Sequence, residues 1–161
     1  MNNKDIEKHI ADFVIENQQK YYRLAYSYVK NQHDALDVVQ DSIIKAISSK
    51  DTLRQPEFIK TWFYRIVTNT ALDYIRKQKR AVVSEEKTLV AYDTGETDQY
   101  PDIDLQKALD ELPCDYRNII ILRYFEELKI EEVAKVLGEN VNTVKTRLYK
   151  TLQKLRIQMS A

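Results

Sequence analysis

The stretch from Glu139 to Arg156 reads ENVNTVKTRLYKTLQKLR, and its residue types suit the binding of phosphate. The chain as a whole balances 25 Lys and Arg against 25 Asp and Glu, yet after Glu139 this stretch has no acidic residue. Its basic residues are Lys145, Arg147, Lys150, Lys154 and Arg156. A sequence-independent attraction to nucleic acid needs local positive charge, whatever the net charge of the protein. The alternative is an amphipathic basic helix whose charges are simply solvated.

Two predicted helices, 130–137 and 142–159, have the spacing of a helix-turn-helix. Counting from Ile130, the fifth residue is Ala134, the ninth Gly138 and the fifteenth Val144. A small residue lets the second helix pack closely, a glycine permits positive φ in the turn, and an apolar residue reaches the shared core. In this motif the first turns of the second helix enter the major groove of DNA.

The candidate DNA-reading residues of this second helix are Asn142, Thr143, Lys145, Thr146, Arg147, Tyr149 and Lys150. We expect Lys145, Thr146 and Tyr149 at base edges, and Arg147 and Lys150 with Asn142 at phosphates or the groove wall. Asn142 is also the predicted N-cap. The predicted buried stripe of the two helices comprises Val133, Leu137, Leu148, Leu152 and Leu155.

An acidic face is predicted on a helix from about Asp34 to Ser49. Asp37, Gln40 and Asp41 stand at positions i, i+3 and i+4, away from the apolar stripe of the same helix. This spacing indicates a docking patch for a basic partner surface. The alternative is a solvated face whose carboxylates favour the positive end of the helix dipole.

A third predicted helix, 57–80, combines positive charge with aromatic rings. Between Phe58 and Arg80 six basic residues oppose one acidic residue, and aromatic side chains stand between them. Basic groups that follow a backbone, with aromatic faces for unstacked bases, suit single-stranded nucleic acid. Trp62 and Phe63 could equally be core residues. The candidate residues are Trp62, Tyr64, Arg65, Asn69 and Arg76.

The elements that must position these residues are all helices. Two Gly and three Pro in 161 residues leave little room for hairpins, and the apolar residues from Ile6 to Tyr28 also have helical spacing. An acidic, poorly periodic stretch separates the third helix from the C-terminal helices. The fold class predicted is all-α, with two small helical domains, 1–80 and 104–161, joined by a flexible acidic linker, 81–103.

Several function classes find no support in the sequence. His9 and His33 are isolated, Cys114 follows a proline, and no phosphate loop or metal-ligand spacing appears, so we expect no enzyme, cofactor, metal or small-molecule substrate. The single Cys114 cannot form an internal disulfide, which indicates a reducing compartment. With neither a signal peptide nor a spanning segment, the protein is expected to be cytoplasmic.

Taken in their order along the chain, the motifs resemble those of bacterial RNA polymerase sigma factors of the extracytoplasmic-function group. "DALDVVQDSIIKA" is similar to the segment that docks on the polymerase β′ clamp helices. "FIKTWFYRIVTNTALDYIRK" looks like the helix that melts the promoter and reads its −10 element. The last 48 residues of the match, from "LDELPCDYRN" to "LQKLR", look like region 4, which reads the −35 element.

The resemblance implies roles for particular residues. Asp37, Gln40 and Asp41 would bind β′, and Asn69 would hold a flipped base of the −10 non-template strand. Lys145, Thr146 and Tyr149 would contact the −35 duplex. It further implies binding to the polymerase β flap and to promoter DNA, and control by an anti-sigma factor that is membrane-anchored, as in small Gram-positive members.

This sequence departs from the family pattern at two places in the recognition helix. Asn142 stands where glycine is frequent, and Lys145 stands where arginine is common. An arginine fork reads guanine with two hydrogen bonds, whereas lysine offers a point charge, so base specificity should differ here. A short acidic linker replaces the family's third region and is expected to thread toward the polymerase active-site channel.

Two other functions remain open from the residues alone. A stand-alone helix-turn-helix transcriptional regulator would use the N-terminal half for sensing or dimerisation and would bind a palindromic site. A protein adaptor would instead bury the aromatic helix against a protein partner.

Overall fold

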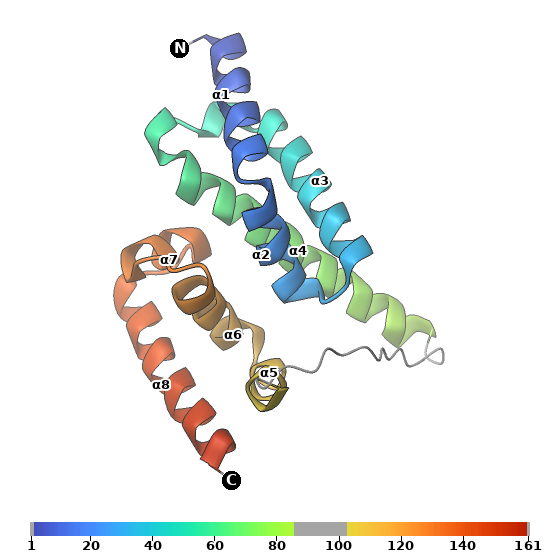
Figure 1. The fold of residues 1–161 in the computed structure, drawn as a ribbon, viewed down its shortest axis with the longest axis vertical. Helices are drawn as coiled ribbons and strands as arrows, with labels where there is room; N and C mark the ends of the chain where they lie inside the picture. Colours follow the sequence, from blue (N-terminus) through green and yellow to red (C-terminus); the bar gives the residue numbers. More distant parts are fainter. Residues whose placement is uncertain (1, 86–102, 161) are drawn as a thin grey trace. The chain divides into compact units, whose positions relative to one another are not determined.

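The computed structural model describes residues 2–85 and 103–160, and it confirms the all-α class (Figure 1). No strand forms among these residues. The chain divides into two compact units, Met1–Arg80 and Ala81–Ala161. Most of the predicted acidic linker, 86–102, lies outside the described residues. Among the described helices, none has the length and apolarity that crossing a bilayer requires.

The N-terminal unit consists of α1 (Asn3–Glu16), α2 (Gln18–Val29), α3 (Gln32–Ser48) and α4 (Ile59–Glu85) (Figure 1). Two short 3-10 turns, η1 (Lys50–Thr52) and η2 (Pro56–Phe58), connect α3 to α4. This connection, 49–58, is called the α3–α4 loop below.

The single apolar pattern from Ile6 to Tyr28 forms two helices because Asn17 interrupts it. The backbone of Asn17 leaves the helical region at ψ 17°, and its side-chain Nδ2 donates to the carbonyl of Phe13 at 2.8 Å. Asparagine competes in this way with backbone hydrogen bonds, which disfavours it inside a helix.

Two other helix boundaries differ from the sequence prediction. α3 begins at Gln32, because the Asn31 side chain accepts a hydrogen bond from the Asp34 backbone N–H at 2.8 Å and caps the helix. α4 runs past Arg80 to Glu85, into the predicted linker. Composition changes at Ala81, but neither Gly nor Pro interrupts the next residues, so helix propensity continues there.

An aromatic cluster forms the centre of the N-terminal unit. The ring of Tyr21 lies 5.9 Å from that of Phe13, 4.7 Å from that of Phe63 and 4.9 Å from that of Tyr64. The predicted stripe of α3 packs inward as well, with these residues buried: Ala35, Val38, Val39, Ser42 and Ala46. The cluster therefore fixes how α1, α2 and α4 rotate about their own axes.

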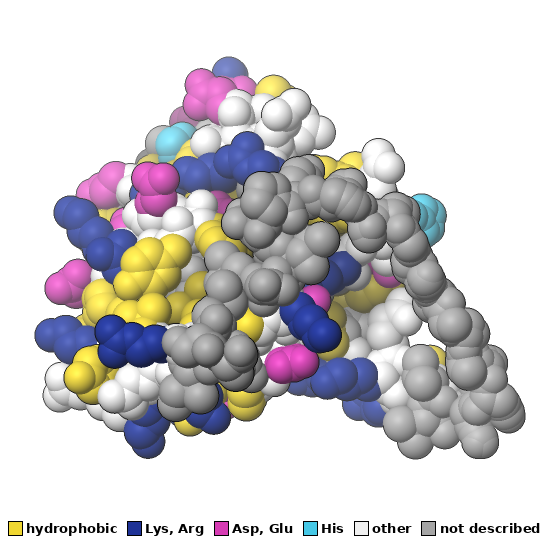
Figure 2. All heavy atoms as spheres, turned by 60° about the horizontal axis from the view of Figure 1, so that its bottom comes forward, with side chains coloured by type: hydrophobic (Ala, Val, Ile, Leu, Met, Phe, Trp, Pro, Cys, Tyr) yellow, Lys and Arg dark blue, Asp and Glu magenta, His cyan; other side chains and the backbone are white. Residues whose placement is uncertain are grey.

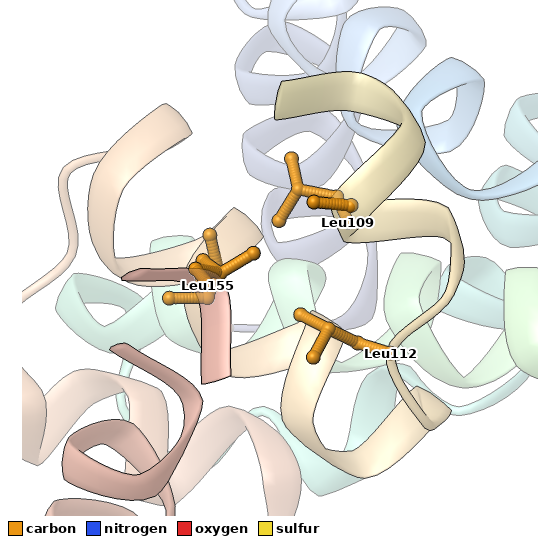
Figure 3. Close-up of a cluster of buried hydrophobic side chains, with 5 residues drawn as sticks. Leu109, Leu112 and Leu155 are labelled. Atoms are coloured by element: carbon orange, nitrogen blue, oxygen red, sulfur yellow. The ribbon is translucent and has the colours of Figure 1, made fainter. Parts of the chain in front are cut away.

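The C-terminal unit consists of α5 (Ile103–Asp110), α6 (Cys114–Ile120), the π-helical turn η3 (Ile121–Phe125), α7 (Ile130–Leu137) and α8 (Val141–Ser160). Leu109, Leu112 and Leu155 point toward one another in its core (Figure 3). These leucines come from α5, from the residues just after it, and from α8, so the last helix is tied to the first helix of the unit.

The helix-turn-helix spacing is confirmed in the packing of α7 against α8. Ala134 and Val144 are buried, and Gly138 ends α7 in the left-handed conformation with φ 70°. Asn142 is not the N-cap: the helix begins one residue earlier, and the Asn140 side chain accepts from the Thr143 N–H at 2.8 Å. This frees the Asn142 side chain from a capping role.

The predicted buried stripe of α8 is wrong at Leu152, which is 40% exposed. Thr151 is buried instead, and its hydroxyl donates to the Arg147 carbonyl at 2.6 Å. Residues 144, 148, 151 and 155 follow the helical repeat more closely than a stripe through 152. A polar side chain can occupy the stripe because its hydroxyl is satisfied within the helix.

Two substitutions test the left-handed positions of the C-terminal unit. Gly138→Ala should lower its free energy of unfolding by about 1–2 kcal/mol, because a Cβ is disfavoured at positive φ. Glu127, at φ 59°, is the opposite case. Glu127→Gly should raise stability by about 0.5 kcal/mol, since relief of strain exceeds the added chain entropy.

Urea unfolding followed by circular dichroism measures both changes. Fluorescence of Trp62, the single tryptophan, reports the N-terminal unit separately and should not shift. Unchanged stability in Gly138→Ala would show that the turn does not depend on the glycine.

Candidate docking and nucleic-acid interfaces

The three residues of the predicted acidic face lie together on the outer side of α3. Gln40 and Asp41 are exposed, and Asp37 is partly exposed with its carboxylate 3.7 Å from His33 Nε2. The side chains between them, Val38 and Val39, point into the core. The face is therefore available to a partner.

Asp34 is close in sequence to this face but has a different role. Its carboxylate accepts hydrogen bonds from Asn31 Nδ2, at 2.6 Å, and from the Tyr74 hydroxyl of α4. Burial, together with the hydrogen bond to Asp34, raises the pKa of Tyr74 to about 12. The Asp34–Tyr74 contact ties the start of α3 to α4.

Exposed apolar residues flank the acidic face and were missed by the sequence analysis. Leu36 and Ile44 lie four residues before and four residues after Gln40, and both are exposed. Helical spacing places all three on one line along α3. Their position outside the buried stripe is the sequence signal that could have identified them.

On α4, the charged and polar candidates face outward. Arg65, Asn69 and Arg76 are all exposed, and Arg76 forms an ion pair with Asp73 at 2.9 Å. Asn69 borders a shallow hollow between α3 and α4, called the Asn69 hollow below. Its lining residues are Lys45, Ser48, Ser49, Ile66, Asn69 and Thr70.

Five of the six residues that line the Asn69 hollow are polar, but most of the surface they present to it is apolar. Lys45 Nζ donates to the Thr70 hydroxyl at 3.2 Å across the gap between the two helices. Lys45, Ser48 and Ser49 could not be predicted as neighbours of Asn69 from the sequence, because this relation arises only when α3 packs on α4. Such a hollow can receive a small planar group, with apolar surface against its faces and polar atoms at its edge.

The two aromatic candidates on α4 differ from each other. Trp62 is half-buried, and its Nε1 donates to the Thr52 hydroxyl in the α3–α4 loop at 2.9 Å. Tyr64 is 0% exposed, so its prediction as a nucleic-acid contact is wrong for this fold. Its ring packs on Tyr21 in the aromatic cluster and cannot stack on a base.

The candidate residues of α8 form an exposed face. Asn142, Lys145, Thr146, Tyr149 and Lys150 are exposed, whereas Thr143 and Arg147 are half-buried. Arg147 is also held, 3.4 Å from the Glu139 carboxylate in the turn before α8. Figure 2 shows one face of the molecule, on which Lys and Arg side chains lie beside hydrophobic ones. The turn thus presents the recognition helix with its basic groups outward.

Comparison with known proteins accounts for both units. The Sigma-70 region 2 family matches residues 13–81, and the Sigma-70 region 4 family matches residues 102–155. The chain is 56% identical to RNA polymerase sigma factor SigV of Bacillus subtilis, over 91% of this chain and 89% of that protein. It is 33% identical to ECF RNA polymerase sigma factor SigW of the same organism, over 92% and 88%.

The chain belongs to the extracytoplasmic-function (ECF) group of RNA polymerase sigma factors. It is therefore an alternative sigma factor that directs transcription initiation. The stand-alone regulator and the adaptor do not account for the chain, because the match includes the N-terminal unit as region 2 as well as the helix-turn-helix.

Two solved structures share the fold of this sigma factor. The sigma factor RpoE from Bartonella quintana, in complex with the anti-sigma factor NepR, has a TM-score of 0.75 at 23% identity, covering 94% of this chain and 96% of that one. CnrH, in complex with the cytosolic domain of CnrY, has a TM-score of 0.68 at 22% identity, covering 94% and 87%.

The Asp34–Tyr74 contact gives a test of how α3 and α4 are joined. Tyr74→Phe should lower the free energy of unfolding of the N-terminal unit by about 1–2 kcal/mol at pH 8, because it removes a hydrogen bond to a carboxylate. The folded pKa of Tyr74, about 12, lies above the ordinary 10.0. This stabilisation should thus be complete below pH 10 and lost as pH rises toward 12.

The measurement is urea unfolding followed by Trp62 fluorescence at pH 8 and pH 11. The difference in free energy of unfolding between wild type and Tyr74→Phe should be smaller at the higher pH. Tyr26→Phe, a change on an exposed ring, is the matched control and should show no narrowing. If the difference in free energy of unfolding between wild type and Tyr74→Phe were the same at both pH values, the pKa of Tyr74 would not be raised in the folded state.

Proposed function

We propose that this sigma factor uses the three surfaces described above for three separate tasks. The acidic face of α3 docks on core RNA polymerase, the outer face of α4 captures the melted −10 strand, and α8 reads the −35 duplex. The observation that carries the proposal is the segregation of charge within the N-terminal unit. The carboxylates of α3 and the basic groups of α4 are exposed on different helices, so each surface has a partner of opposite sign.

The polymerase contact combines charge with apolar burial. Asp37, Gln40 and Asp41 offer acceptors to basic side chains of the β′ clamp helices, and Leu36 and Ile44 offer apolar area beside them. Exposed ion pairs alone contribute little, whereas buried apolar side chains at the centre of an interface contribute most of its affinity. The C-terminal unit contacts the β flap in the same holoenzyme.

The −10 contact centres on Asn69 and its hollow. Flipping a base out of the stack costs a few kcal/mol, and stacking on an aromatic ring returns about 1–3 kcal/mol. Several contacts are therefore needed: Asn69 pairs with the base edge, the exposed part of Trp62 stacks, and Arg65 and Arg76 lie along the phosphates. Tyr64 has no part in this contact because it is buried.

The −35 contact is a helix in the major groove. Lys145, Thr146 and Tyr149 reach base edges, and Thr143, Arg147 and Lys150 with Asn142 face the backbone and groove wall. The ion pair with Glu139 holds Arg147 in place before DNA arrives. Because lysine replaces the bidentate arginine fork at position 145, discrimination for guanine there is weaker than arginine would give.

An anti-sigma factor is the proposed regulator. One of the two solved structures compared above, RpoE from Bartonella quintana, was determined with the anti-sigma factor NepR, and the other, CnrH, with the cytosolic domain of CnrY. Apolar residues such as Leu36, Ile44 and Phe58 are exposed on the N-terminal unit and would be covered in such a complex. We place the sigma factor in the cytoplasm, where it meets polymerase, and its anti-sigma factor in the membrane. An excess of the anti-sigma cytosolic domain should prevent comigration with polymerase.

Size-exclusion chromatography with bacterial core RNA polymerase tests the docking surface. The wild-type chain should comigrate with the core enzyme, and the Asp37→Ala, Gln40→Ala, Asp41→Ala triple variant should not. The matched control is Asp12→Ala with Glu16→Ala on the exposed side of α1, which removes two carboxylates and should comigrate. Comigration of the triple variant at wild-type yield would refute docking through α3.

Two variants of α8 separate base reading from phosphate contact. Lys150→Ala should weaken holoenzyme binding to all promoters alike and reduce the slope of log K against log salt by about 0.9. Lys145→Ala should lose about 1–3 kcal/mol of discrimination at one base pair and keep its preference elsewhere. Binding is measured as a salt titration with a promoter mapped by transcribing genomic DNA with the reconstituted holoenzyme.

Lys107→Ala, which removes an exposed charge from α5, is the control for both variants. Its salt slope and its base preference should match those of the wild type. If Lys150→Ala leaves the slope unchanged, α8 does not lie along the DNA backbone as proposed.

A further inference from the structure

The first helix of the chain holds both ends of the α3–α4 loop. Near the start of the loop, Lys50 Nζ lies 3.1 Å from the Glu7 carboxylate of α1. Near its end, His9 Nε2 lies 3.1 Å from the backbone carbonyl of Pro56. Since a carbonyl only accepts, Nε2 of His9 carries the proton and donates. These contacts join residues more than forty positions apart in sequence.

The loop forms part of the Asn69 hollow. Ser49 lines the hollow directly and is followed by Lys50, which α1 holds. The Thr52 hydroxyl accepts from Trp62 Nε1 at 2.9 Å and donates to the Ser49 carbonyl at 2.7 Å. A chain of contacts thus connects Glu7 of α1, through the loop, to one wall of the hollow and to Trp62.

The Glu7 side chain is 45% exposed, but the residues around the two contacts are packed. Ile10 of α1 is fully buried, Leu53 in the middle of the loop is buried, and the Lys50 side chain is only 22% exposed. Phe13 of α1 packs edge-on against Phe63 of α4 at 6.4 Å between ring centres. Because α1 packs on α4 and is also bonded to the loop, the wall of the hollow that the loop forms cannot move freely relative to the wall that α4 forms.

We infer that Glu7 and His9 of α1 are positioning residues, which clamp the α3–α4 loop so that the Asn69 hollow keeps the width needed to capture a base. The inference rests on the proposed function of that hollow. Glu7 and His9 lie before the residues 13–81 that match region 2, so the family match does not account for their contacts. Neither residue touches nucleic acid in this role.

Held binding elements bind more tightly than loose ones, because less conformational entropy is lost on binding. A hydrogen bond or ion pair of ordinary strength corresponds to an effect of about three- to tenfold in affinity. The clamp should therefore strengthen capture of one base by that factor and leave binding of the polymerase unchanged.

The test uses holoenzyme reconstituted with core polymerase and a fluorescent single-stranded oligonucleotide that carries the −10 element of the mapped promoter. A series of oligonucleotides, each with one abasic position, first identifies the captured base. It is the position where removal weakens binding by the wild type but not by Asn69→Ala.

His9→Leu, which cannot donate, should then bind the intact oligonucleotide about three- to tenfold more weakly and the abasic one within about twofold of wild type. His9→Gln, whose amide can donate to the Pro56 carbonyl, should behave as wild type. Glu7→Lys and Lys50→Glu should each weaken capture, and the double variant should restore it. Restoration excludes a direct contact between Lys50 and a phosphate, which the swap would not repair.

The outcomes separate the two hypotheses. A captured base that depends on Asn69, with no effect of the α1 variants, would overturn the clamp and leave the proposed function standing. If the α1 variants lost the same affinity for the intact and the abasic oligonucleotide, Glu7 and His9 would have a general structural role, which would also overturn the clamp. If no position depends on Asn69, the hollow does not capture a base, and both hypotheses fail. If His9→Leu does not fold, the charge-swap series alone decides.

Discussion

The packing of Tyr21 against Phe63 and Tyr64 is the interaction on which the N-terminal unit depends. Two consecutive aromatic residues of α4 are buried against one ring of α2, and a helix can satisfy this in only one rotation about its axis. That rotation turns Arg65, Asn69 and Arg76 outward. The same core receives the apolar stripe of α3, so the acidic face of α3 must also look outward. The functional surfaces of this sigma factor are thus consequences of its core.

The C-terminal unit follows a similar logic with a different constraint. A left-handed residue at Gly138 sets the angle between α7 and α8, and Val144 and Leu155 anchor α8 on the core. The remaining face of α8 carries the basic residues outward. A chain of zero net charge can bind DNA when its basic residues are concentrated on the binding surfaces, because positive charge is needed only where phosphate is to be bound. Some of the acidic residues form the acidic face of α3, which suits a basic protein partner. Others are concentrated in the middle of the sequence.

Much of this could be predicted from the sequence. Periodicity was sufficient for the helices, and the spacing of Ala134, Gly138 and Val144 was sufficient for the turn, because both depend on near neighbours along the chain. Where the prediction was wrong, the cause was local capping or packing. Asn140 rather than Asn142 caps α8, and Asn17 breaks the first pattern by bonding its own helix. Tyr64 could not be assigned from its neighbours, since aromatic residues serve equally as core or as binding platforms.

The sequence by itself determined the class of fold, the two units, the family and most of the polar residues that lie on the outer faces of α3 and α8. Each of these follows from residue types repeated at short range. Only the tertiary structure decided which side of α4 is free, that Lys45 and Ser49 meet Asn69 in one hollow, and that Glu7 and His9 hold the α3–α4 loop. Those relations join residues 20 to 47 positions apart, and such distances close only when the helices pack.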